Sequence, residues 1–179
     1  TSSCKACLNP RLIKMTQNEA LFKSIFDRNN RKVYHLCYGY TGDSDAANDL
    51  MQETFIKVWQ NLDKFRNQSQ ISTWIYRIAV NTCLSYLRVE KRKVTDEINE
   101  RIIETKADEV SDKQEQVNQL YKCIAQLEEN ERIIITMVLD EVPYQEIAEI
   151  SGISEGNLRV KIHRIKNKLT EIYNRHERF

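Results

Sequence analysis

The chain has 179 residues, and its 27 Lys and Arg side chains balance 26 Asp and Glu, which leaves a formal net charge of +1 at pH 7. This balance excludes a uniformly basic protein, and no apolar run approaches the roughly 18 residues that a membrane-spanning helix needs. Only 4 Gly and 2 Pro are present, so few tight turns can form. We therefore expect an all-α protein without membrane insertion, built as one domain or as two small ones.

The net charge hides an uneven distribution along the chain. Residues 1–92 carry 14 basic and 8 acidic side chains, a net charge of +6, whereas residues 93–115 carry 4 and 8, a net charge of −4. Residues 116–150 carry 2 and 7, giving −5, and residues 151–179 carry 7 and 3, giving +4. A polyanion would therefore meet two separate basic footprints. The acidic 116–150 segment could also face the basic N-terminal block and keep two domains packed together.

Hydrophobic periodicity predicts three helices in a first domain over residues 16–92, after an N-terminal arm over residues 1–15. The first helix is expected over about 17–40. Asp43 or Ser44 can then act as the N-cap of the second helix. The buried stripe of this second helix is predicted to hold Ala46, Ala47, Leu50, Met51, Phe55, Val58, Trp59 and Leu62.

The third helix is followed by a change in composition. Ser72 or Thr73 can cap this helix, and its core face includes Trp74. Over residues 93–115 the apolar residues become isolated and charges dominate, which predicts an acidic linker. Periodicity resumes over residues 116–179 and predicts four more helices in a second domain.

The segment YQEIAEISGISEGNLRVKIH, residues 144–163, has the pattern of a helix-turn-helix. The close crossing of its helices needs a small residue, the turn needs one that tolerates positive φ, and the second helix needs an aliphatic anchor. Ala148, Gly152 and Leu158 supply these, and Ser154 can cap the second helix. Arg and Asn can read base edges, and Lys neutralises phosphate. The candidates for DNA contact on and beside the outward face are Asn157, Arg159, Lys161, His163, Arg164 and Lys168. The alternative is a plain helical hairpin with a solvated basic face.

A longer string in the first domain is more specific: DAANDLMQETFIKVWQNLDKFRNQSQISTWIYRIAVNTCLSYLR, residues 45–88. It resembles region 2 of bacterial sigma factors. Its pairing with a region-4-like helix-turn-helix across a short acidic linker resembles the extracytoplasmic-function (ECF) group of the sigma-70 family. The resemblance covers about residues 20–90 and 116–170. It implies two helical domains, regions 2 and 4, in a transcription factor that is not an enzyme and needs no cofactor.

The resemblance also implies partners for each domain. It implies binding to core RNA polymerase through the β′ clamp helices and the β flap, and recognition of the −10 and −35 promoter elements with help in opening the DNA. It further implies a bacterial cytoplasmic location and an anti-sigma factor that holds the protein when idle. The string DLMQETF corresponds to the core-binding signature. The core-binding candidates, on the polar face opposite the buried stripe, are Asp49, Gln52, Glu53, Lys57 and Gln60.

The third helix and the loop before it are implied to bind the −10 element, with a base pocket beside the helix. Aromatic rings next to cations and an amide suit single strands, whose bases can stack. The −10 candidates are Lys64, Phe65, Arg66, Ser72, Thr73, Tyr76, Arg77, Asn81 and Arg88. The pocket is expected from Phe65, Asn81 and the loop 67–72. Tyr76 has a core position as an equal alternative, and Trp74 is assigned to the core.

Metal and catalytic sites receive little support from the sequence. Cysteines at positions 4, 7, 37, 83 and 123 are an odd number in a helical pattern, which predicts reduced thiols rather than a disulfide framework. Cys4 and Cys7 have half of a zinc site's spacing, and His35 with Cys37 could supply the other half, but we expect no metal. A dimeric DNA-binding regulator and a protein-binding helical adaptor are the alternative functions, although the KFR and TWIYRIAVN strings have no role in a simple repressor.

Overall fold

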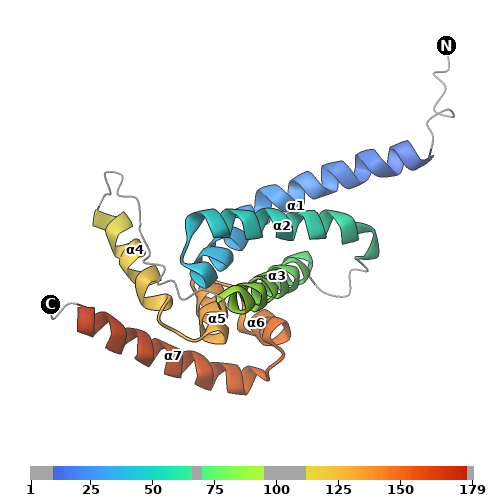
Figure 1. Cartoon of the computed structure of the whole chain (residues 1–179). Coiled ribbons are helices and arrows are strands. Elements are labelled where there is room, and N and C mark those ends of the chain that lie inside the picture. The colour runs from blue at the N-terminus through green and yellow to red at the C-terminus, as the bar shows by residue number, and fades with distance from the viewer. Residues whose placement is uncertain (1–9, 66–69, 95–111, 177–179) are drawn as a thin grey trace, which may run out of the picture.

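Helices account for all regular secondary structure in the part of the chain that the computed structural model describes, residues 10–65, 70–94 and 112–176. The first unit contains α1 (Pro10–Thr41), α2 (Ser44–Asn61), a short 3-10 helix (Leu62–Lys64) and α3 (Ile71–Val94). The second contains α4 (Asp112–Ile124), α5 (Glu129–Leu139), α6 (Tyr144–Ser151) and α7 (Glu155–His176). In Figure 1, α5 and α6 lie between the N-terminal helices and α7. The expected all-α fold is confirmed, and no described helix has the length and hydropathy that crossing a bilayer requires.

The ends of the first two helices follow from local sequence. Gly42, with φ of 72°, ends α1 in the left-handed region that glycine tolerates. The Asp43 side chain then accepts a hydrogen bond from the backbone N–H of Ala46 at 2.6 Å, so the predicted N-cap of α2 is confirmed. The predicted start of α1 at residue 17 is wrong, because the helix begins at Pro10, whose fixed φ suits a first helical position.

Two other predicted boundaries also differ from the structure. Helix α3 begins at Ile71, so Ser72 and Thr73 lie inside its first turn and do not precede it as caps. Their hydroxyls are therefore available for contacts outside the helix. Helices α3 and α4 extend into both ends of the predicted linker, whose middle, residues 95–111, lies outside the described residues.

Both units contribute buried side chains to one apolar core. The side chains at the centre of the first are Val33, Leu36, Val58, Ile75 and Ala79, all at most 1% exposed. Those at the centre of the second are Ile124, Met137, Ile147, Leu158 and Ile165, all fully buried. The apolar stripes that periodicity predicted thus supply the interior of both units, and the polar sides of α2 and α7 are left outward.

The two units pack directly against each other, α1 on α5 and α3 on α6. Arg132 Nη1 donates to the carbonyl oxygen of Tyr40 at 3.1 Å, and His35 Nδ1 lies 2.9 Å from Asp140 Oδ1. Burial raises the pKa of the Asp140 carboxyl, and its hydrogen bond to His35 opposes that change. The prediction that the acidic 116–150 segment faces the N-terminal block is therefore confirmed.

Candidate nucleic-acid and partner interfaces

The polar face of α2 lies opposite its buried stripe, as the sequence predicts. Its exposed candidates for partner binding are Asp49, Gln52, Glu53 and Gln60. Lys57 is half-buried, and its Nζ lies 3.1 Å from Thr82 Oγ1 on α3 and 2.6 Å from Glu53 Oε1. Lys57 therefore joins α2 to α3 at the border of this face.

The residues predicted to bind core polymerase leave out two exposed apolar side chains that lie beside these polar residues. Ile56 is 56% exposed and Trp59 is 40% exposed. The prediction that Trp59 lies in the buried stripe is wrong, since its ring only meets Phe22 edge-on, with centroids 5.2 Å apart. Exposed apolar side chains rimmed by polar ones are typical of a protein-binding surface. The sequence signal is Ile56, which follows Gln52 by four residues and Glu53 by three and lies outside the core stripe.

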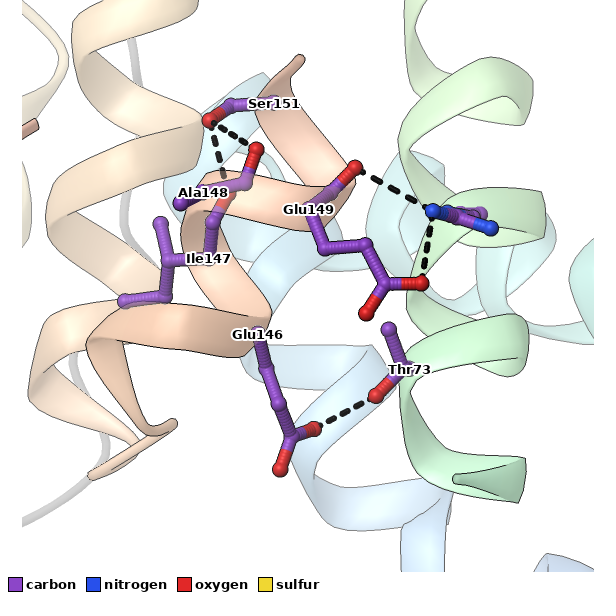
Figure 2. A network of polar contacts seen from close by, with 7 residues as sticks. Thr73, Glu146, Ile147, Ala148, Glu149 and Ser151 are labelled. Carbon is purple, nitrogen blue, oxygen red and sulfur yellow. Dashed lines mark hydrogen bonds and ion pairs between the residues drawn. The ribbon is translucent and has the colours of Figure 1, made fainter. Parts of the chain in front are cut away.

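The start of α3 carries predicted DNA contacts that α6 covers. Thr73 is 1% exposed, and its Oγ1 donates to Glu146 Oε2 at 2.6 Å, while Ser72 Oγ lies 3.5 Å from the same oxygen. Arg77 Nη2 donates to Glu149 Oε1 at 2.8 Å and to the Glu149 carbonyl at 3.3 Å. Figure 2 shows Glu146 and Glu149 extending from α6 toward α3. Three predicted DNA contacts thus bond to the chain's own carboxylates.

Tyr76 belongs to the packed interior in this arrangement. It is 3% exposed, and its hydroxyl has no hydrogen-bond partner among the described residues. Burial raises the pKa of Tyr76, and the nearby carboxylates of Asp140 and Glu146 raise it further. The sequence allowed Tyr76 to lie either on the DNA-binding face or in the core, and in the structure it lies in the core.

We expect Tyr76→Phe to stabilise the folded protein. A buried hydroxyl without a partner loses its hydration and gains nothing in return, so its removal should raise the free energy of unfolding by about 1 kcal/mol. Urea denaturation followed by circular dichroism measures this difference. A loss of stability would mean that the hydroxyl has a partner and would contradict the assignment.

The remaining −10 candidates lie before α3 and along it. The Phe65 ring packs against Trp74, with centroids 5.1 Å apart, and Trp74 is half-buried against the core as expected. Arg66 lies outside the described residues. Candidates that remain exposed are Lys64, Asn81 and Arg88.

Helices α6 and α7 meet at the turn that the helix-turn-helix pattern predicts. Gly152 has φ of 70° at the C-cap of α6, so the predicted positive φ is confirmed. The backbone N–H of Asn157 donates to Ser154 Oγ at 3.4 Å, which confirms the predicted cap of α7. Leu158 is fully buried and Ala148 packs against the core. This local geometry leaves the first turns of α7 facing outward.

The outward face of α7 is open to solvent. Its exposed candidates for DNA contact are Asn157, Arg159, His163, Arg164 and Lys168, and Lys161 is half-buried beside them. Val160 lies among these residues and is 53% exposed, although the sequence prediction left it out. The sequence indicates this exposure, because Val160 is an apolar residue outside the stripe that Leu158 and Ile162 form.

Two of the residues predicted to contact the −35 element interact with other residues of this protein. Arg159 pairs with Glu155 one turn earlier, and its guanidinium lies 5.3 Å from the centre of the Tyr144 ring on α6. Lys168 Nζ lies 2.7 Å from Glu131 Oε1 on α5, and this hydrogen bond raises the pKa of Lys168. Both residues therefore tie α7 to its neighbours.

Cys37, Cys83 and His35 have contacts within the fold. Cys37 Sγ lies 3.8 Å from Cys83 Sγ, and both residues are fully buried and free. His35 Nδ1 contacts Asp140 Oδ1. No group of three or more His, Cys, Asp or Glu within the described residues is arranged to hold a metal ion, and Cys4 and Cys7 lie outside them.

Two family descriptions match the chain in order: Sigma-70 region 2 over residues 25–93, and Sigma-70, region 4 over residues 118–169. The chain is also 31% identical over 163 residues to the ECF RNA polymerase sigma factor SigW of Bacillus subtilis (strain 168), which covers 83% of this chain and 86% of the relative. The chain belongs to the ECF group of the sigma-70 family. This sigma factor therefore directs RNA polymerase to promoters, which replaces the regulator and adaptor alternatives.

Other relatives and solved structures agree with this membership. The sigma factor is 33% identical over 165 residues to the ECF RNA polymerase sigma-E factor of Escherichia coli (strain K12), covering 85% of this chain and 86% of the relative. It resembles the sigma factor RpoE from Bartonella quintana, solved in complex with the anti-sigma factor NepR, with a TM-score of 0.72, 25% identity, and coverage of 86% and 96% of the two chains. CnrH, solved with the cytosolic domain of CnrY, shares the fold with a TM-score of 0.62, 18% identity, and coverage of 87% and 89%.

Proposed function

We propose that this sigma factor works through three separate faces: α2 for core polymerase, α3 with the turn before it for the −10 element, and α7 for the −35 element. The observation that carries this proposal is the exposure pattern, in which α2 and α7 turn polar and basic faces outward, opposite continuous buried stripes. The core polymerase partners would be the β′ clamp helices for region 2 and the β flap for region 4. The side-chain chemistry of each face supports its assignment separately.

The α2 face combines charge with apolar area. Asp49, Gln52, Glu53 and Gln60 would supply hydrogen bonds, with Lys57 at the border. Ile56 would supply the desolvated centre of the contact, since it is the most exposed large apolar side chain among the described residues. A polar rim around a small apolar centre suits a partner that must bind and later release.

The α7 face has the residue types that read a major groove. Arg164 can bond bidentately to guanine, Asn157 can bond to adenine, and Lys161 with His163 can contact phosphates. Val160 would contact the C5-methyl group of a thymine, because it is an exposed apolar side chain and apolar contact with that methyl group is favourable. Arg159 and Lys168, already paired inside the protein, would contribute by orienting α7 or by exchanging partners on DNA.

The α3 face suits a single strand of DNA. Phe65 offers a ring on which a base can stack, Asn81 offers an amide for a base edge, and Lys64 and Arg88 offer cations. Ser72, Thr73 and Arg77 would bind phosphate oxygens, with Tyr76 beneath them. Extruding a base costs on the order of a few kcal/mol, which a preformed pocket offsets.

We expect Asn81→Ala to slow promoter opening and to leave the initial binding of closed promoter DNA nearly unchanged. The reason is that the proposed amide contact forms only with an unpaired base. A loss of about 1–3 kcal/mol is the range for one base-edge contact. Stopped-flow fluorescence of a labelled −10 region, with core polymerase present, measures the opening rate. A normal rate would refute the pocket.

Two further proposals concern where and with whom this protein works. We place it in the bacterial cytoplasm, with an anti-sigma factor that restrains it. The support is that RpoE of Bartonella quintana, similar over 86% of this chain, was solved with its anti-sigma factor NepR. Affinity purification of the tagged protein from unstressed cells tests for such a partner.

A further inference from the structure

Lys168 of α7 is attached to a carboxylate that has little freedom to move. Its Nζ donates to Glu131 Oε1, in the first turn of α5, at 2.7 Å. Glu131 is only 7% exposed, and its Oε2 accepts a hydrogen bond from the backbone N–H of Glu128 at 3.4 Å. This capping box holds the Glu131 side chain against its own helix. Glu131 is thus a fixed point on α5 to which α7 is tied.

The surroundings of Lys168 disfavour a phosphate group. A pocket between the start of α5 and α7 is lined by the carboxylates of Glu128, Glu131 and Glu171 and by the cations of Lys168 and Arg175. Three acidic groups against two basic ones give this pocket a net charge of −1, which repels an anion. If Lys168 turned to DNA, the buried Glu131 carboxylate would lose its cation, which costs free energy. Lys168 is therefore better placed to hold Glu131 than to bind phosphate.

The place of Lys168 along α7 suits a brace for the residues that precede it. Leu158 and Ile165 are fully buried and attach α7 to the core, but apolar contacts are non-directional. A hydrogen bond has a preferred direction, so the bond to Glu131 limits rotation of α7 about its own axis. Lys168 follows Arg164 by four residues, which puts both side chains on one face of the helix. Fixing Lys168 thus fixes the direction in which Arg164 leaves α7.

We propose that Lys168 is a positioning residue: through Glu131 it sets the orientation of Arg164 in the major groove of the −35 element, and it makes no phosphate contact of its own. The inference rests on the proposed −35 role of α7. It divides the outward face of α7 into a part that reads DNA, up to Arg164, and a brace at Lys168. It also separates Lys168 from Lys161, which is proposed to contact phosphate.

Three variants separate a brace from a phosphate contact. Lys168→Met removes the charge and keeps most of the length of the side chain. Glu131→Gln removes the charge that holds Lys168 and leaves this lysine free to reach a phosphate. A lysine that contacts DNA would therefore bind as well or better in Glu131→Gln, whereas a brace would fail. Lys168→Arg keeps a cation that can pair with Glu131 and should behave as the parent protein does.

Each change has a matched control. Lys161→Met removes a lysine that is proposed to contact phosphate. Lys166→Met removes an exposed lysine of α7 that is not among the candidates for DNA contact. Glu171→Gln removes an exposed carboxylate that lines the same pocket as Glu131. Thermal unfolding followed by circular dichroism establishes that every variant is folded at the temperature of the binding assay.

The measurements use the full-length protein with core polymerase, a promoter fragment at which the parent protein initiates, and a copy of that fragment with a scrambled −35 element. The ratio of the two affinities measures reading of the −35 sequence, and the slope of log affinity against log salt concentration counts phosphate contacts. Lys168→Met and Glu131→Gln should each lower the ratio about fivefold or more, because a base contact is misaligned. Their slopes should match that of the parent protein, and combining them should add little further loss. Lys161→Met should make the slope shallower by about 0.9, the value for one phosphate. Lys166→Met and Glu171→Gln should keep the parent ratio.

Two results would overturn the proposal. One is a slope that is shallower by about 0.9 in Lys168→Met, because it would make Lys168 a phosphate contact. The other is an unchanged ratio in Lys168→Met and Glu131→Gln, even with a lower melting temperature, because the pair would then serve stability alone. If Arg164→Ala lowers the ratio in the same assay, the −35 role of α7 stands and only the brace is wrong. If Arg164→Ala and Lys161→Met also leave ratio and slope unchanged, the −35 role fails and the brace fails with it.

Discussion

Arg164→Ala should weaken recognition of the −35 element by about 1–3 kcal/mol, roughly a 5- to 150-fold loss of affinity, because a bidentate contact to guanine is lost. Arg164 is exposed on α7, and among the described residues its guanidinium makes no ion pair or cation–π contact, unlike that of Arg159. The loss should appear in electrophoretic or fluorescence assays of promoter binding by the polymerase complex, and it should be largest at one base pair of the −35 element.

Arg175→Ala is the matched control for this change. Arg175 lies on the same helix, is exposed and carries the same charge, but it follows the helix-turn-helix by more than ten residues. It should alter promoter affinity much less and without preference for sequence. Core binding should survive both changes, and an equal loss of core and −35 binding in Arg164→Ala would contradict the separation of roles between α7 and α2.

Ile56→Arg should cost at least about 2 kcal/mol of affinity for core polymerase, roughly 30-fold, since truncation or replacement of a central contact residue has effects of this size. The side chain is 56% exposed, so the substitution should leave the fold and its stability nearly unchanged. Arginine would place an unpaired charge where the proposed interface is desolvated. Surface plasmon resonance with immobilised core polymerase measures the change.

Val117→Arg provides the comparison for Ile56→Arg. Val117 is an exposed apolar residue of α4, 44% accessible, and lies outside the α2 face. It should retain most of the core affinity. Circular dichroism of both variants guards against unfolding, and full core affinity in a folded Ile56→Arg variant would contradict the assignment of α2.

Local patterns explain what could be predicted from the sequence. The helix-turn-helix was predictable because Ala148, Gly152 and Ser154 each meet a requirement set by their immediate neighbours, and the structure confirms the left-handed glycine and the serine cap. The cap at Asp43 was predictable for the same reason. Family resemblance added the partners, which periodicity alone does not identify.

Positions at the edge of a stripe and contacts between distant residues were less predictable. Trp59 lies where the α2 stripe borders solvent, and whether such a residue is buried depends on how closely α1 covers it. Thr73 and Glu146 are 73 residues apart in the sequence. Charge distribution predicted that an acidic segment would face the N-terminal block, but only the packing of α5 on α1 determines which carboxylates meet which residues of α3.

The most direct test of the central claim is run-off transcription with purified core polymerase and a library of genomic promoter fragments. Adding this protein should permit initiation at a restricted set of promoters that share one −35 and one −10 sequence. Core polymerase alone should not initiate at these promoters. If core polymerase with this protein initiates at no promoter in the library, its role as a sigma factor is contradicted.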